Sequence, residues 1–332
     1  MRRTLIIVLL ITGLSVILAG LAGFDLYRFA RQKNAQPATL ILITPGSSLR
    51  KIAGELKEHN LINSRRRFIM LNRILHSSAR LQAGEYQIAA ASTPLEIIAA
   101  LQEGRVYQRQ VTIPEGFTLT QIGARLEALG LCRSEEFKSL TTSPQALKNW
   151  QIAGETLEGY LFPSTYNYSR QTSCREILDI MIATSLQQRQ SLTAAAPASS
   201  LTELQILTMA SLIQKEAGNN EEMPLISSVF HNRLRKHMRL ASDPTTIYAL
   251  GENFDGNLRR RDLNHPSPYN TYRHYGLPPG PICSPGTAAF EAALKPVPTD
   301  YLYFVSRNDG RHQFSRTLKE HNQAVRKYQL KR

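Results

Sequence analysis

The sequence predicts an α+β protein that starts with a single N-terminal transmembrane helix and continues as a small α+β module and a larger, mixed α+β domain. Three observations predict this organisation: an uncharged run near the N-terminus, a strand–turn–helix pattern that occurs twice, and a loop-rich C-terminal half that contains one long apolar helix. The 332 residues are enough for about two domains with a sizeable core. A net charge of +14 favours anionic partners.

Residues 1–30 are predicted to form a short cytoplasmic tail and a transmembrane anchor. The run from Leu5 to Phe24 has no charged residue, and about twenty helical residues at about 1.5 Å each span about 30 Å, the thickness of the apolar part of a bilayer. A cleaved signal peptide has a shorter apolar region of about 7 to 15 residues. Because basic residues flank the run on both sides, the positive-inside rule is nearly balanced, and we expect the usual arrangement of a short inner tail and an exported C-terminal part.

The segment after the anchor predicts a linker and then an internal repeat. Residues 31–39 are polar and contain a proline, which is typical of a short linker. Residues 43–62 align with residues 113–132 at an offset of 70 positions, with six identical pairs. Each copy predicts a strand, a Pro/Gly turn and a helix capped by Ser47 or Thr118. We therefore expect one module over residues 40–105 and a second copy at residues 106–140, inside a larger domain over residues 106–330.

The cysteines predict neither a disulfide framework nor a metal site. There are three of them, Cys132, Cys174 and Cys283, which is too few for such a framework and odd in number. Cys132 takes the place of Ile62 in the repeat, so we expect it to be a small buried hydrophobe. No C-x-x-C or H-E-x-x-H pattern occurs, and we expect no metal and no cofactor.

A carboxylate at the end of an apolar helix is the strongest candidate for chemistry. Apolar residues recur at steps of three and four from Ile206 onwards, and the helix is predicted to end at Glu216, with Gly218 as a left-handed cap. Asn219 and Glu222 have the spacing of a capping box for a second helix. A helix C-terminus and partial burial both raise the pKa of a carboxyl group, as a general acid requires. Lys215 would lower this pKa if its ammonium group turned towards Glu216, and position alone also allows a solvated glutamate.

The chain resembles the endolytic murein transglycosylase family (YceG-like). The resemblance rests on "ASLIQKEAGNNEEMPLISSVFHNRLRKHMRLASDPTTIYALG", followed by "YNTYRHYGLPPGPICSPG" and "YLYFV", and on their order after a single anchor, a LysM-like module and "EGYLFP". There are two departures from the family pattern: Ser164 stands where an acid is typical, and Cys283-Ser284 replaces Ala-Asn.

The resemblance implies a function and a location. It implies cleavage of the β-1,4 bond between N-acetylmuramic acid and N-acetylglucosamine without water, through closure of a 1,6-anhydro ring, with Glu216 as the single general acid/base. The substrate would be nascent peptidoglycan glycan strands, and cleavage would terminate strand elongation. Penicillin-binding proteins, which synthesise peptidoglycan, would be partners. The protein would be a single-pass protein of the bacterial cytoplasmic (inner) membrane, with its catalytic domain on the extracytoplasmic side.

Six further residues are predicted to bind substrate: Asn232, Asp243, Tyr269, Asn270, Thr271 and Tyr272. The last four suit a sugar-binding wall, because aromatic rings stack on sugars and amides bond to N-acetyl groups. Asn232 and Asp243 are expected to face the site. For Asp243, capping of the next helix is an alternative, and for Asn232, a hydrogen bond to a turn. Four basic residues are expected to form a solvated face, with contact to the carboxylates of stem peptides as the alternative: Arg233, Arg235, Lys236 and Arg239.

Two other functions stay open. A muramidase that uses water would need a second carboxylate near Glu216, for which Glu158, Asp243 and Asp262 are the candidates. A non-catalytic scaffold would bind the cell wall through the LysM-like module. Nucleic acid is not an expected partner, since no binding motif is present and the anchor argues against it.

Overall fold

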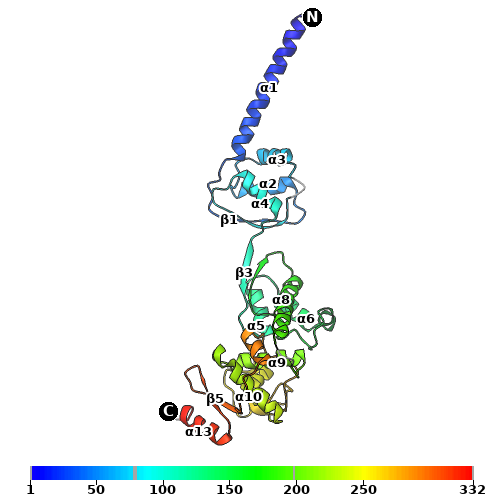
Figure 1. The fold of residues 1–332 in the computed structure, drawn as a ribbon. Helices are drawn as coiled ribbons and strands as arrows, with labels where there is room; N and C mark the ends of the chain where they lie inside the picture. Colours follow the sequence, from blue (N-terminus) through cyan, green and yellow to red (C-terminus); the bar gives the residue numbers. More distant parts are fainter. Residues whose placement is uncertain (1, 78–80, 197–198, 331–332) are drawn as a thin grey trace. The chain divides into compact units, whose positions relative to one another are not determined.

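The computed structural model describes residues 2–77, 81–196 and 199–330, and the chain divides into two compact units (Figure 1). The first unit runs to Arg109 and also contains Asn167–Gln171; the second comprises Gln110–Tyr166 and the chain from Thr172 onwards. Helices dominate both units, and the strands of the described residues form three two-stranded sheets, β1–β2, β3–β4 and β5–β6. The predicted α+β class is therefore confirmed.

Helix α1 (Arg2–Ala30) is the predicted N-terminal helix, and it is continuous. Among the described residues, the segment Leu5–Ala30 is the one helix long and apolar enough to cross a membrane. Its last turn is not separate from the module after it, because Leu26, Phe29 and Ala30 are buried in the core of the first unit. The predicted linker at residues 31–39 is irregular up to residue 38, yet it is fastened to the module, since the backbone and side-chain amides of Asn34 both donate to the carbonyl of Ser92 at 3.0 Å.

The first unit contains a strand–helix–helix–strand module followed by one more helix. Its elements are β1 (Thr39–Ile43), α2 (Leu49–Glu58), α3 (Arg65–Ile74), β2 (Gly84–Ile88) and α4 (Pro94–Glu103). β1 pairs with β2 in antiparallel register, from Thr39 opposite Ile88 to Ile43 opposite Gly84. The inner face of the sheet and the helices close one apolar core, which includes Ile41, Leu56, Phe68 and Ile97.

The same order of elements follows from Gln108 onwards, mostly in the second unit, so the repeat is longer in the structure than in the sequence. The second copy consists of β3 (Gln108–Thr112), α5 (Leu119–Ala128), α6 (Ser134–Thr142), the extra helix α7 (Pro144–Asn149) and β4 (Thr165–Ser169). Parts of its two strands, up to Arg109 and from Asn167, belong to the first unit. Thr118 caps α5, as predicted, but the cap of α2 is Ser48 and not Ser47. Ser47 is instead held by a hydroxyl–hydroxyl hydrogen bond of 2.8 Å to Thr44.

The rest of the second unit surrounds helix α9. Its helices and strands are α8 (Cys174–Ala194), α9 (Glu203–Glu216), α10 (Met223–Arg235), α11 (Asp243–Leu250), α12 (Thr287–Leu294), β5 (Tyr303–Ser306), β6 (His312–Ser315) and α13 (Leu318–Tyr328), with short 3-10 turns at Asn220–Glu222, Gly251–Asn253 and Asp262–Asn264. Every residue from Ile206 to Ile213 is buried, because α9 packs against α10, α11 and α12. β5 and β6 form the hairpin that Asp309-Gly310 predicts.

The expectation for Cys132 is wrong in one respect. Cys132 is buried, as predicted, but it forms a disulfide with Cys174, which lies 42 residues further along the chain. The bond joins the end of the repeat to the start of α8. Counting cysteines could not reveal it, since one bridge needs only two cysteines that the tertiary fold brings together. Cys283 is the free, buried cysteine.

We expect the disulfide to stabilise the second unit. Closing a loop of this length removes conformational entropy from the unfolded chain, so loss of the bond should lower the free energy of unfolding by about 2 to 4 kcal/mol. Thermal unfolding of the full chain with and without reductant measures the effect. The double variant Cys132→Ser/Cys174→Ser should unfold earlier and no longer respond to reductant, whereas Cys283→Ala should still respond; an unresponsive wild type would contradict this.

Candidate active site

Helix α9 delivers Glu216 to a sharp change of chain direction. The helix starts at a capping box, in which the Thr202 hydroxyl accepts from the backbone of Gln205 and the Gln205 side chain accepts from the backbone of Thr202. It ends where Ala217 turns extended, at φ −71° and ψ 129°. The prediction that Gly218 is a left-handed cap is wrong, since its φ is not positive. A glycine is needed there because a Cβ atom would lie 2.5 Å from the carbonyl oxygen of Gly310.

The turn that follows Glu216, at residues 217–222, is held by hydrogen bonds to the β5–β6 hairpin. Asn219 caps the next turn, as predicted, by accepting from the backbone of Glu222 at 3.1 Å, and its amide donates to the carbonyl of Gly310 at 3.0 Å. The Glu222 carboxylate does not complete the box. It accepts instead from the backbone of His312 and lies 2.9 Å from the ring of that histidine. The turn thus depends on residues about 90 positions away.

Glu216 is partly buried, and among the described residues one side chain donates a hydrogen bond to its carboxyl group. The Ser242 hydroxyl donates to Oε1 at 2.5 Å. Burial raises the pKa of Glu216 to about 7, the Ser242 hydrogen bond opposes this rise, and the charge of Asp243 adds to it. Lys215 does not offset the shift, because its ammonium group acts on Glu158 instead. The Glu216 carboxyl group therefore keeps its proton to a higher pH than an ordinary glutamate does.

One cation near Glu216 was not expected from the sequence. Arg233 is part of the run for which we expected a solvated face, yet its guanidinium donates to the carbonyls of Leu302 at 2.7 Å and Leu240 at 2.5 Å. It also lies over the ring of Tyr303. From this fixed position its charge lowers the pKa of Glu216. No local pattern separates Arg233 from the exposed basic residues beside it.

Asp243 faces the site and does not cap its helix. It is the first residue of α11, whose N-cap is Ser242, and its Oδ1 accepts from the hydroxyl of Tyr272 at 2.5 Å. Of the three carboxylates considered as partners of Glu216, it is the one whose charge acts on Glu216 within the described ranges. Asp262 accepts from the backbone of Arg259 at 2.8 Å, and Glu158 has partners of its own.

Three of the predicted substrate-binding residues lie behind the surface. Asn232, Asn270 and Thr271 are at most 4% exposed. Asn232 donates to the carbonyls of Thr299 and Tyr301, at 2.7 and 2.9 Å. A direct contact with a ligand is therefore not open to these side chains in this conformation.

Asn270 and Thr271 hold the loop that carries Ser242. The Thr271 hydroxyl accepts from the backbone amide of Ser242 at 3.0 Å, and the Asn270 amide donates to the carbonyls of Leu263 and His265 at 3.0 and 2.8 Å. The buried Thr271 side chain thus fixes the backbone of Ser242, whose hydroxyl donates to Glu216, and the buried Asn270 side chain fixes the segment just before Thr271. Tyr272 and Tyr269 stay partly exposed, and the ring of Tyr269 packs on that of Tyr248 at 5.0 Å between centroids. They are the members of this wall that a ligand could reach.

The second copy of the repeat is joined to the site through backbone atoms. The amide of Gly116 donates to the carbonyl of Ser284, and the amide of Ser284 donates to the carbonyl of Phe117, both at 2.8 Å. Next to this pair, Gln214 of α9 accepts from the amide of Gly286 at 2.9 Å. Because main-chain atoms make the contacts of Ser284, its departure from the family pattern leaves the junction intact. Ser164 likewise acts through its carbonyl, which accepts from Ile113 at 2.9 Å.

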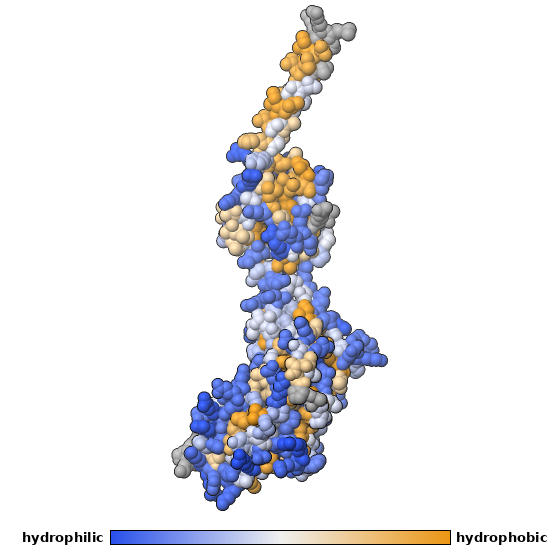
Figure 2. Space-filling view, viewed as in Figure 1, coloured by the Kyte–Doolittle hydropathy of each residue, from blue (hydrophilic) through white to orange (hydrophobic). Residues whose placement is uncertain are grey.

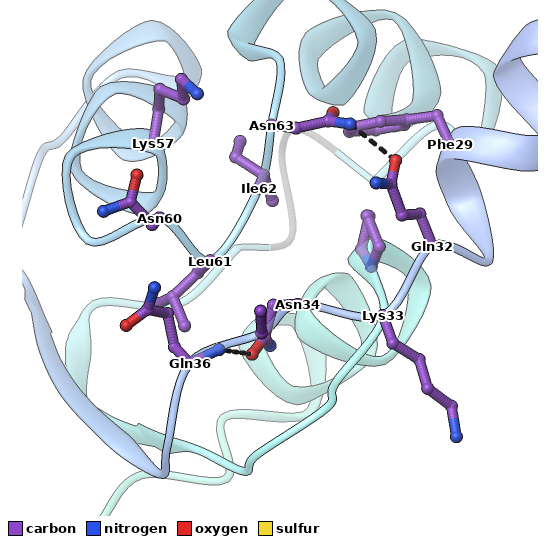
Figure 3. A pocket seen from close by; sticks show the side chains of 12 residues that line it. Phe29, Gln32, Lys33, Asn34, Gln36, Lys57, Asn60, Leu61, Ile62 and Asn63 are labelled. Atoms are coloured by element: carbon purple, nitrogen blue, oxygen red, sulfur yellow. Dashed lines mark hydrogen bonds between the residues drawn. The ribbon is translucent and has the colours of Figure 1, made fainter.

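A separate cavity of about 320 Å³ lies in the first unit (Figure 3). Phe29, Lys33, Lys57 and the amides of Gln32 and Asn63 line it, and these two amides share a hydrogen bond of 2.6 Å. It does not include Glu216. In the described ranges, no three His, Cys, Asp or Glu side chains gather as a metal site would require.

Glu158 is a second carboxyl group with a raised pKa. It is 4% exposed, it accepts from the backbone of Leu119 at 3.2 Å and from the hydroxyl of Tyr248 at 3.3 Å, and burial raises its pKa to about 7. The folded chain therefore binds this proton more tightly than the unfolded chain. The resulting stability is fully present below the ordinary pKa of 4.5 and is lost as the pH rises through about 7.

We expect Glu158→Gln to gain stability relative to the wild type as the pH rises from 5 to 8, by about 1 to 3 kcal/mol, because glutamine carries no buried charge. Chemical unfolding of both proteins at each pH measures the difference. The exposed Glu135→Gln on α6 is the matched control. A Glu158→Gln effect that is constant across this range would refute the raised pKa.

The comparisons with known proteins agree with one another. The model of the YceG-like family matches residues 41–327. A protein of Bacillus subtilis named endolytic murein transglycosylase is 37% identical over 316 residues, which cover 90% of this chain and 86% of the relative. A protein of the same name from Streptococcus pneumoniae is 29% identical over 326 residues, covering 88% of this chain and 58% of the relative.

A solved structure extends the likeness to the fold. The crystal structure of a YceG-like protein of Listeria monocytogenes is 35% identical in sequence, with a TM-score of 0.58, and the match covers 86% of this chain and 98% of that protein. The matched ranges contain both copies of the repeat, helix α9 and the wall beside it. The chain belongs to the YceG-like family.

Proposed function

We propose that this chain is an endolytic murein transglycosylase that cleaves the β-1,4 bond between N-acetylmuramic acid and N-acetylglucosamine and leaves a 1,6-anhydro end. Glu216 acts as the single general acid/base. As an acid it protonates the leaving glycosidic oxygen, and as a carboxylate it then takes the proton from the 6-hydroxyl group of the muramoyl sugar, which closes the ring. The observation that carries the proposal is the partly buried Glu216 carboxyl group at the end of α9, which accepts a hydrogen bond from Ser242 and whose pKa is raised to about 7.

The environment of Glu216 suits both halves of this reaction. Burial keeps the acid protonated at the start, and the Ser242 hydroxyl stabilises the carboxylate that forms when the proton leaves. Arg233 stabilises the same charge from a fixed position. Because the sugar supplies its own nucleophile, the reaction needs no second catalytic carboxylate. Tyr269, Tyr272 and Asp243 are the side chains that we propose for contact with the glycan.

One observation favours a second function, a muramidase that uses water. The charge of Asp243 acts on Glu216, so Asp243 could serve as the second carboxylate of a glycosidase. Its hydrogen bond from Tyr272, at 2.5 Å, engages one carboxylate oxygen and leaves the other for a water molecule. The products separate the two functions, since ring closure gives anhydro ends and hydrolysis gives reducing ends.

The apolar helix α1 and the disulfide support a proposal for the location of the chain. We propose that α1 anchors the chain in the cytoplasmic membrane and that both units lie on the extracytoplasmic side, where disulfides form and persist. The strand–helix–helix–strand module of the first unit then serves as the LysM-like, glycan-binding part. Cleavage near the membrane would end the growth of new strands, and peptidoglycan synthases of the penicillin-binding class are the proposed partners.

We expect Glu216→Gln to lower the release of soluble muropeptides from purified sacculi by at least about 100-fold, because the acid and the base are lost together. Mass spectrometry of the products measures both their amount and their ends. The neighbouring exposed Glu221→Gln should keep full activity. Loss of release by Glu216→Gln together with retained glycan binding would argue against a non-catalytic scaffold. Reducing ends in the wild-type products would favour the muramidase. Unchanged release by Glu216→Gln would end the proposal.

We expect the activity to fall as the pH rises above about 7, since Glu216 must start protonated. Ser242→Ala should move this fall to higher pH, because it removes a bond that favours the carboxylate. Asp243→Asn should move it to lower pH, because it removes a charge that disfavours the carboxylate. Each shift should be about one pH unit or less. Profiles of kcat/KM against pH measure both, and shifts in the same direction would contradict the assignment.

A further inference from the structure

Helix α3 of the first unit presents an exposed face that the proposed function does not use. Its buried side consists of Phe68, Leu71 and Asn72. Its other side carries Met70 and Ile74, 49% and 56% exposed, and is followed by Leu75, 45% exposed. Such large apolar side chains together on one short helix are more than the scattered exposure that any protein surface shows.

Arginines surround this apolar face. Arg66 and Arg73 are exposed and lie on the same side of α3 as Met70 and Ile74, at steps of four and three residues. The helix, with the sequence RRRFIMLNRI, contains no acidic residue. An apolar stripe flanked by arginines is typical of a helix that lies in the surface of a membrane with anionic lipids.

The contacts of α3 with α1 place this face at the level of the membrane surface. Arg67 of α3 forms an ion pair of 2.8 Å with Asp25. Asp25 directly follows Phe24, the last residue of the uncharged run that begins at Leu5. Since that run matches the thickness of the apolar bilayer core, about 30 Å, Asp25 lies where the hydrocarbon ends and the headgroups begin.

No flexible linker separates the anchor from the module that contains α3, within the described residues. The last turn of α1 belongs to the core of the first unit, so the module starts where the anchor leaves the membrane. Figure 1 shows α3 beside the end of α1, and Figure 2 shows apolar surface on the module next to that end. Tyr27, 54% exposed with Arg31 over its ring at 4.8 Å, adds an aromatic residue and a cation of the kind found at membrane interfaces.

We propose that α3 is an interfacial helix that docks the first unit on the bilayer in which α1 is anchored. Met70, Ile74 and Leu75 enter the boundary between headgroups and acyl chains, and Arg66 and Arg73 bind the phosphates of anionic phospholipids. The module then has one fixed orientation to the membrane, in addition to the tether that α1 provides. This inference rests on the anchor and is independent of the cleavage reaction.

Depth-dependent fluorescence quenching on the full chain tests the proposal. Because Cys132 and Cys174 are paired and Cys283 is buried, a thiol introduced on the described surface can be labelled selectively. An environment-sensitive dye is attached in Met70→Cys and, as a control, in Leu42→Cys, a residue 39% exposed on β1. The chain is reconstituted in phosphatidylcholine vesicles with and without phosphatidylglycerol, and co-flotation reports insertion of α1.

The dye at position 70 should shift to the blue and be quenched by a spin label on a shallow acyl carbon, and the dye at position 42 should do neither. Arg66→Gln with Arg73→Gln should lower the docked-to-undocked ratio about 30-fold in a titration of phosphatidylglycerol, at about 1 kcal/mol for each arginine. The pair Arg50→Gln and Arg105→Gln, exposed arginines outside α3, should leave it unchanged.

Two outcomes would overturn the proposal. Equal quenching at positions 70 and 42 in chains that float with the vesicles would show that α3 has no preferred place at the membrane. A blue shift at position 70 without quenching by the lipid label would show that a protein surface, such as a second copy of this chain, covers α3.

Discussion

The partial burial of the Glu216 carboxyl group at the end of the buried helix α9 is the constraint on which the candidate site of the second unit depends. Helix α9 is buried along its middle, so its last residue cannot move without the helices around it. The helix ends at Glu216, where Ala217 turns extended, and Gly218 then passes so close to the carbonyl of Gly310 that no side chain fits there. The carboxyl group lies beside Ser242 in a partly buried position, and burial raises its pKa to about 7.

Most of the polar residues near Glu216 do not contact it but hold the segments around it in place. Thr271 positions the backbone of Ser242, Asn270 fixes the loop behind it, and Asn232 ties α10 to the segment before β5. A buried donor that is fully hydrogen-bonded rigidifies its surroundings, whereas an unsatisfied one would destabilise them. The irregular segment at residues 265–286 is thus ordered without helices or strands of its own.

In the first unit, the helix that is apolar enough to cross a membrane also contributes its last turn to the core of the module. Apolar residues of α1 continue directly from the uncharged run into the packing against α3 and α4. A helix that is apolar all round in its outer part and buried in its last turn can serve both a bilayer and a protein core, because each is an apolar solvent for its side chains. The ion pair between Asp25 and Arg67 marks the change from one to the other.

The sequence by itself determined what depends on neighbours along the chain. The periodicity of apolar residues set helix α9, the cap residues Thr118 and Asn219 set the starts of their helices, and Asp309-Gly310 set the hairpin. The position of Glu216 at a helix end was readable for the same reason. These features need only local hydrogen bonds and side-chain spacing, which a single sequence contains.

Only the tertiary structure decided which distant groups meet. The disulfide of Cys132 with Cys174, the reason for a glycine at position 218 and the donor from Ser242 to Glu216 all join residues that are far apart in the sequence. So does the fixed guanidinium of Arg233, which looks like its exposed neighbours until Leu302 is placed beside it. Contacts of this kind arise from the packing of whole elements, and no local pattern of residue types encodes them.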